Sequence, residues 1–196
     1  MTLILASGSA ARRQMLQAAG LDFAVELPQM DEEGAKASLR REGLSPRDQA
    51  NALAELKALS VSRKRAGLVI GADQMLAVEG EVLDKPRSAA EARQHLLRLR
   101  GRTHELITAA TITRDGAAIW RHIDTPKLKM RAFSDDFLDD YMRYAGDDVL
   151  RSVGAYQLEG LGAQLFERVE GDFFSVLGLP LLPLLAFLRE HGVVRA

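Results

Sequence analysis

The sequence predicts an α/β fold in which helices flank a mixed, twisted β-sheet. Three observations predict it: short apolar runs alternate with stretches of helical periodicity, some neighbouring runs are separated only by a two-residue turn, and others are separated by a helix. Two-residue turns join antiparallel strands, whereas a helical connection suits parallel ones. The sheet is therefore expected to contain both kinds of pairing.

The runs predicted as strands are distributed over most of the chain. They are residues 2–6, 68–78, 81–83, 106–113, 117–123, 127–133, 154–158 and 163–169. Glu79-Gly80 and Asp115-Gly116 separate neighbouring runs by two residues, which predicts a hairpin at each place. Asp73 and Gln74 interrupt the second run, where an unpaired carboxylate in apolar surroundings is costly.

The predicted helices have recognisable start and stop residues. They run from Ser9 to Gly20, from Ser45 to about Arg65, from Ser88 to Gly101, from Ser134 to Gly146, and from Leu179 onward. Serine is favoured at the start because its hydroxyl accepts a hydrogen bond from a free N–H of the first turn. Glycine is favoured after the end because it adopts the left-handed conformation at low cost.

Composition and charge exclude several classes of protein. The 196 residues are 47% hydrophobic and 27% charged, which suits one globular domain over residues 1–196. The net charge of -1 argues against a protein held on nucleic acid by bulk charge, and the absence of cysteine excludes thiolate sites. The N-terminal run has no basic leader and the apolar C-terminal stretch is shorter than the roughly 18 residues that cross a bilayer, so we expect neither export nor membrane insertion.

Four common kinds of site are also disfavoured. The four histidines lack the spacing of a zinc site, and the chain has neither the P-loop nor the dinucleotide-binding glycine pattern. Its few aromatic residues are not interleaved with basic ones, as a surface that stacks nucleic-acid bases would require.

The first candidate site is the segment from Ser7 to Arg13, between the first strand and the first helix. Ser-Gly-Ser at a helix start offers hydroxyls and free N–H groups to an anion, and arginines of the first turn can bind phosphate oxygens. The alternative is a serine cap followed by two solvated arginines.

The second candidate is Asp73. A carboxylate embedded in a strand must be paired, bind a metal or take part in proton transfer, although it could also cap a nearby turn. Asp31-Glu32-Glu33 and Lys85 add acids and a cation elsewhere. Oxygen ligands suit Mg²⁺ or Mn²⁺, while lysine and arginine neutralise phosphate, but each of these residues alone is also typical of a surface.

Seven segments of the chain occur in a distinctive order. They are LILASGSAARRQML, MDEE, LAELKA, GADQMLAVEGEVLDKP, GRTHELITA, VGAYQLEGLGAQLFERVEG and VLGLPL, from about residue 3 to residue 190. Together they resemble the Maf family of nucleoside triphosphate pyrophosphatases. The resemblance implies hydrolysis of a nucleoside triphosphate to the monophosphate and pyrophosphate, with Mg²⁺ or Mn²⁺ as cofactor. It also implies a cytoplasmic protein, often a homodimer, with a Maf or inosine triphosphate pyrophosphatase-like architecture around a central cleft.

The resemblance also assigns roles to individual residues. The family's phosphate loop matches Ser7, Ser9, Arg12 and Arg13. Its catalytic positions match Asp73, Lys85, Lys57 and Glu32. Asp73 would accept a proton from the attacking water, and Glu32 and Asp73 would hold the metal.

Three positions distinguish branches of the family, and here they hold Ala11, Gln74 and Glu159. The branch acting on dTTP and UTP has Arg, Thr and Gln there, whereas Gln74 and Glu159 resemble the branch acting on 7-methyl-GTP. Guanine presents N1–H and N2–H₂ donors that a carboxylate can accept, while thymine and uracil present one N–H between two carbonyls. The aromatic residue common in that branch is replaced by Ala11. We therefore expect 7-methyl-GTP as substrate, with dTTP or UTP as the alternative.

Two non-enzymatic hypotheses remain. One is a nucleotide-binding regulatory protein of cell division without turnover, although a pure binder has no need of an acid embedded in a strand. The other is a structural α/β protein without a nucleotide, which would fail if a triphosphate raised the melting temperature.

Overall fold

The computed structural model describes residues 2–195, which form two compact units. Unit 1 comprises the chain up to Gln74, Thr108–Asp124 and the chain from Phe173 onward; unit 2 comprises Met75–Ile107 and Thr125–Asp172. Strands β3 (Leu68–Val78) and β5 (Thr103–Arg114) have residues in both units. The expectation of a single domain over residues 1–196 stays a prediction.

Unit 1 contains most of the helices. Its other elements are β1 (Leu3–Ala6), α1 (Ala10–Ala18), β2 (Ala24–Val25), α2 (Glu32–Arg41), α3 (Pro46–Ser62), β6 (Ala117–Asp124), α6 (Phe173–Val176) and α7 (Leu181–Glu190). The strands β1, β2 and β3 are parallel, with β1 in the middle, and β5 and β6 form the hairpin predicted at Asp115-Gly116. The sheet is therefore mixed, as predicted.

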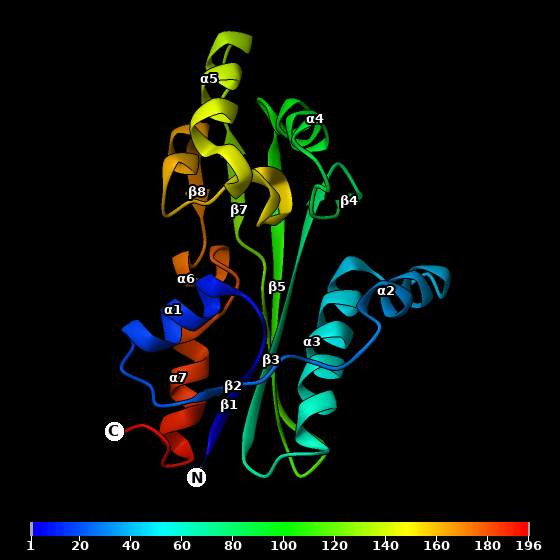
Figure 1. Ribbon diagram of the computed structural model, residues 1–196, viewed down its shortest axis with the longest axis vertical. Coiled ribbons are helices and arrows are strands. Elements are labelled where there is room, and N and C mark those ends of the chain that lie inside the picture. Colours follow the sequence, from blue (N-terminus) through cyan, green and yellow to red (C-terminus); the bar gives the residue numbers. More distant parts are fainter. Residues whose placement is uncertain (1, 196) are drawn as a thin grey trace. The chain divides into compact units, whose positions relative to one another are not determined.

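Alternation along β1 and β3 gives unit 1 two cores. Leu3 and Leu5 pack in a cluster with residues of α1 and α7, whereas Ile4 packs with residues of α3. Helices α1 and α7 accordingly lie on one face of these strands and α3 on the other (Figure 1). The apolar runs that were predicted to be buried strands are thus buried on both faces, which is typical of parallel sheets covered by helices.

A glycine brings α3 close to β3. A Cβ atom on Gly71 would lie 2.1 Å from the Ala54 carbonyl oxygen and 2.7 Å from the Ala58 nitrogen, both on α3. Only glycine permits this approach without a shift of the helix. Asp73, two residues later, lies on the same face of β3 because side chains alternate along a strand.

Unit 2 is built from short strands, two helices and 3₁₀ turns. Its elements are β4 (Glu81–Leu83), α4 (Ala89–Leu99), β7 (Lys127–Met130), α5 (Asp135–Ala145), β8 (Phe166–Glu170) and the 3₁₀ turns Gly146–Leu150, Val153–Ala155 and Leu161–Leu165. Strand β4 forms the predicted hairpin with β3, and β7 pairs antiparallel with both β5 and β8.

The structure corrects two predicted strands, both in unit 2. Residues 154–158 are not a strand, because Gly154 and Ala155 have φ of 80° and 63°, outside the extended region. Residues 163–165 belong to a 3₁₀ turn, so β8 begins only at Phe166. Strand β7 also ends at Met130, earlier than the predicted residue 133.

Within residues 2–195, no helix combines the length and the apolar character needed to cross a membrane.

Candidate functional site

The candidate site lies where β1 ends. The helices that connect β1 to β2 and lead into β3 lie on opposite faces of these strands. From β1 the chain passes through α1 to β2 on one side, and β3 follows α3 on the other side. The order β2-β1-β3 therefore reverses at β1, and ligands of α/β sheets bind at the carboxyl ends of strands at such a point. Strand pairing between β1 and β3 ends at Ala6 and Gly71, so the next carbonyl of β3, at Ala72, is free to bind a side chain.

The loop from Ser7 to Ser9 connects β1 to α1. Ser9 is the N-cap of α1, and its hydroxyl accepts from the Arg12 N–H at 3.4 Å. Ser7 is buried, and its hydroxyl accepts from the Ser9 N–H at 3.2 Å. Both serines thus shape the loop, and the start of α1 has the positive end of the helix dipole that favours an anion.

Arg12 is held by three neutral oxygens. Its Nη1 donates to the Ala72 carbonyl at 2.9 Å and to the Ser7 hydroxyl at 3.3 Å, and its Nε donates to the Gly178 carbonyl at 2.7 Å. Desolvation lowers the pKa of Arg12, although the negative charges of Asp73 and Glu32 oppose the shift. No carboxylate of the described residues forms an ion pair with this guanidinium, so its charge is oriented but not neutralised by contact.

Lys57, on α3, joins two carboxylates from different elements. Its Nζ lies 2.7 Å from Asp73 Oδ1 and 3.0 Å from Glu32 Oε2. The Lys57 and Asp73 residues are 8% and 5% exposed, so each is the other's main compensation for lost hydration. The structure therefore brings together three residues predicted separately from the sequence.

Glu32 reaches this cluster from the first turn of α2. The helix begins at Asp31, whose carboxylate caps it by accepting from the Gly34 N–H at 2.9 Å. Desolvation raises the pKa of Glu32, but the ammonium groups of Lys57 and Lys36 outweigh it and hold this pKa below its usual value.

Lys36 is a residue that the sequence reasoning missed. Its Nζ lies 3.1 Å from Glu32 Oε1 and 3.7 Å from Glu33 Oε1. Desolvation lowers the pKa of Lys36, but Glu32 and the charge of Asp73 outweigh it and raise the pKa above its usual value. The spacing of four residues from Glu32 was the available signal, because such pairs meet on one face of a helix.

Gln74 points away from this cluster, to the face of β3 opposite Asp73. Its Nε2 donates to the Thr108 hydroxyl at 2.8 Å and to the carbonyls of Ser175 and Val176 at 3.0 and 3.1 Å. The amide nitrogen is therefore engaged within unit 1, which leaves Oε1 as the group available to a ligand.

The other predicted residues are more exposed. In the first turn of α1, Ala11 is half-buried and Arg13 is exposed. Lys85, between β4 and α4, and Glu159, in the turn closed by the Gly160 N–H and the Gln157 carbonyl, are exposed residues of unit 2. The roles of these four toward a substrate stay predictions.

The family of Maf-like proteins matches residues 2–191. The chain belongs to this Maf family. Proteins named nucleoside triphosphate pyrophosphatase, from Rhodospirillum rubrum and Hyphomonas neptunium, are 54% and 53% identical to it, over 98% and 99% of this chain and 96% and 98% of theirs. A Mesorhizobium japonicum protein named 7-methyl-GTP pyrophosphatase is 49% identical over 98% of this chain and 97% of its own. These names describe hydrolases of acid anhydrides, and the resemblance inferred from the seven segments is confirmed.

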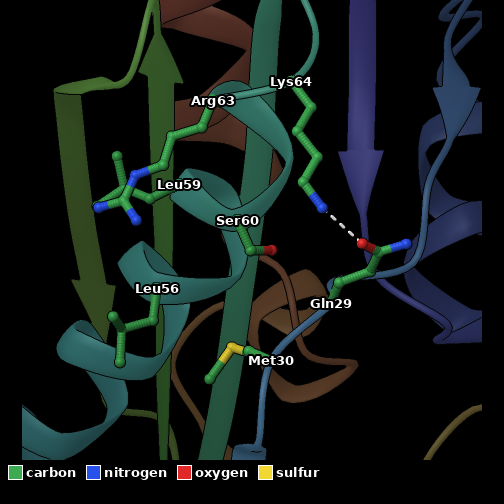
Figure 2. A pocket seen from close by; sticks show the side chains of 7 residues that line it. All are labelled: Gln29, Met30, Leu56, Leu59, Ser60, Arg63 and Lys64. Atoms are coloured by element: carbon green, nitrogen blue, oxygen red, sulfur yellow. Dashed lines mark hydrogen bonds between the residues drawn. The ribbon is translucent and has the colours of Figure 1, made fainter.

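A hollow on unit 1 of this Maf protein involves none of the predicted site residues. It has a volume of about 260 Å³ and is lined by Gln29, Met30, Leu56, Leu59, Ser60, Arg63 and Lys64. Figure 2 shows these side chains along α3 and the segment before α2, with Lys64 Nζ bonded to Gln29 Oε1 at 2.5 Å. The candidate site at the end of β1 and on β3 therefore shares no lining residue with this hollow.

Proposed function

We propose that the protein is a nucleoside triphosphate pyrophosphatase that releases a nucleoside monophosphate and pyrophosphate. The observation that carries this proposal is the buried Asp73, bonded to Lys57 in the same unit as the oriented guanidinium of Arg12. A group for proton transfer and cations for phosphate are the two requirements of this hydrolysis. The names of the close relatives support the same activity.

In the proposed reaction, the carboxylate of Asp73 orients a water and accepts its proton. The water oxygen forms a bond to the α-phosphorus, the bond from this phosphorus to the bridging oxygen breaks, and pyrophosphate leaves with the electron pair. Lys57 fixes the orientation of the carboxylate and stabilises its negative charge. Arg12 binds phosphate oxygens, where charge builds up on the leaving group.

We also propose that a divalent metal binds with the substrate, as the Maf family resemblance implies. Among residues 2–195 no three acidic or histidine side chains form a cluster that could hold a metal alone. Mg²⁺, however, is commonly held by one or two carboxylates together with water and substrate phosphates. Glu32 and Asp73 fit that pattern and would supply the protein ligands. The metal, when bound, neutralises charge on the phosphates.

Asp73→Asn tests the reaction. We expect kcat to fall by roughly 10²–10⁴-fold because the amide cannot accept the proton. Release of pyrophosphate and monophosphate is measured with Mg²⁺ and with Mn²⁺, and circular dichroism checks the fold. Asp136→Asn, at an exposed carboxylate on α5, is the matched control and should leave the rate unchanged. A folded Asp73→Asn protein with the parental rate would exclude this role for Asp73.

For the substrate we propose 7-methyl-GTP, since Glu159 can accept from both donors of the guanine edge. A close relative bears that substrate in its name. A panel of 7-methyl-GTP, GTP, dTTP and UTP should give the highest kcat/KM for 7-methyl-GTP, and Glu159→Gln should reduce that preference. Highest activity on dTTP or UTP would keep the reaction but reject this substrate. Binding without turnover over the whole panel would favour the regulatory hypothesis instead.

A further inference from the structure

We infer that Gln74 is a positioning residue for Arg12: it fixes the turn after α6, whose Gly178 carbonyl orients the guanidinium. This inference rests on the proposed function, because it gives Arg12 the task of binding phosphate. It concerns only residues of unit 1. It also differs from the expectation that Gln74 recognises the base.

The hydrogen bonds of Gln74 fix the orientation of its amide. The Thr108 hydroxyl donates to the Ser175 carbonyl at 2.8 Å, so a lone pair of the same hydroxyl is available to the Gln74 amide. The other two partners of Gln74 Nε2 are carbonyls, which can only accept. Turning the amide over would place its oxygen against these acceptors, so the nitrogen must face α6.

The carbonyls that Gln74 binds belong to the end of a very short helix. Besides local bonds such as that from the Gly178 N–H to the Ser175 carbonyl, the last two carbonyls of α6 accept from donors outside the helix. Gln74 and Thr108 supply them from β3 and β5. Ser175 also donates its hydroxyl to Asp124 Oδ2 at 2.6 Å, which anchors α6 to β6.

The turn that follows α6 leads directly to Arg12. Gly178 donates its N–H to the Ser175 carbonyl at 3.1 Å, and its own carbonyl accepts from Arg12 Nε at 2.7 Å. A Cβ atom on Gly178 would lie 3.6 Å from Arg12 Nε and 3.9 Å from Gln74 Oε1. The Ser175 carbonyl therefore links the amide of Gln74 to the turn, and the Gly178 carbonyl links the turn to the guanidinium of Arg12.

A base-free ligand distinguishes positioning from base recognition. Gln74→Met keeps the length of the side chain and removes its donors. We expect the affinity for Mg²⁺-pyrophosphate, measured by calorimetry, to fall roughly tenfold, because the turn whose Gly178 carbonyl orients Arg12 loses the bonds from Gln74 that fix it. KM should rise by a similar factor for triphosphates with different bases. In a protein that already carries Arg12→Met, adding Gln74→Met should lower the pyrophosphate affinity little further.

A second variant is made at Thr108, whose side chain cannot contact a ligand because the residue is fully buried. Thr108→Val removes the hydroxyl between Gln74 and Ser175 and should lower pyrophosphate affinity in the same direction, whereas Thr108→Ser should restore it. Gln49→Met is the matched control, since Gln49 is also buried and its Nε2 donates to the Leu44 carbonyl at 2.7 Å. Its pyrophosphate affinity should stay at the wild-type value.

The outcomes separate this inference from the proposed function. Wild-type pyrophosphate affinity in Gln74→Met and Thr108→Val, with a changed preference among bases in Gln74→Met, would overturn the positioning role and make Gln74 a base-recognising residue. A wild-type protein that neither binds pyrophosphate nor hydrolyses any triphosphate would overturn the proposed function, and the inference with it. Should Gln74→Met fail to fold, the comparison of Thr108→Val with Thr108→Ser decides the question.

Discussion

A single ammonium group, that of Lys57, contacts two carboxylates that are far apart in the sequence. Because the lysine and Asp73 are both buried, removing the lysine leaves an uncompensated carboxylate in the interior, whereas removing Asp73 leaves the lysine with Glu32 as its partner. Glu32 is different, since its side chain is 40% exposed and water screens its contribution. The same cluster therefore joins a buried ion pair to a carboxylate that is accessible to solvent.

Glu32 should make stability depend on pH. Its pKa is lower in the folded protein than in the unfolded chain, so the unfolded chain binds the proton more readily. The resulting stabilisation is present above the usual glutamate pKa of about 4.3 and is lost as the pH falls through the lower pKa of the folded state. The free energy of unfolding, measured with urea, should decrease less between neutral and acidic pH in Glu32→Gln than in the parent. We expect the two decreases to differ by less than about 1 kcal/mol.

The control for this measurement is Glu167→Gln, at an exposed carboxylate on β8. Its stability should follow the wild-type pH dependence. An unchanged dependence in Glu32→Gln would show that the contacts with Lys57 and Lys36 contribute nothing to stability.

At the level of elements, the distance between α3 and β3 decides whether the cluster can form. Gly71→Ala would place a methyl group against the Ala54 carbonyl, and neither backbone can move without shifting a packed element. We expect a loss of unfolding free energy of about 1–3 kcal/mol, measured by urea denaturation. Gly160→Ala is the control, because its Cβ would approach only the Gln157 carbonyl, at 3.9 Å, and its stability should change little. Equal stability of both variants would contradict this close approach.

For the whole molecule, the sequence predicted the elements whose formation is local. Serine caps at Ser9, Ser45 and Ser134 accept hydrogen bonds as expected, and Asp115-Gly116 adopts positive φ at both residues, as a tight hairpin requires. Helix α2 was not predicted because it buries no residue and so has no apolar stripe. The strand predicted over residues 154–158 was wrong because an apolar composition does not show that Gly154 has a positive φ.

The candidate site was only partly accessible to the same reasoning. Asp73 was singled out because an acid in a buried strand is unusual, and Lys57 was placed on its helix. Their contact depends on α3 packing on β3, which no local pattern reveals. Alternation along a strand does place Asp73 and Gln74 on opposite faces. It does not show which residues contact each side chain there, and these contacts are the basis for proposing a reaction role for Asp73 and a positioning role for Gln74.

The position of these two neighbours makes β3 intolerant of changes in length. Deleting one residue between Leu68 and Ala72 would shift the rest of the strand by one place and exchange the faces of every following side chain. Asp73 would then take the place of Ala72, among the apolar side chains packed with α1 and α7, while Gln74 would take the place of Asp73 beside Lys57. A shift of one residue in this strand would thus bury a carboxylate among apolar side chains and leave Lys57 without its buried partner.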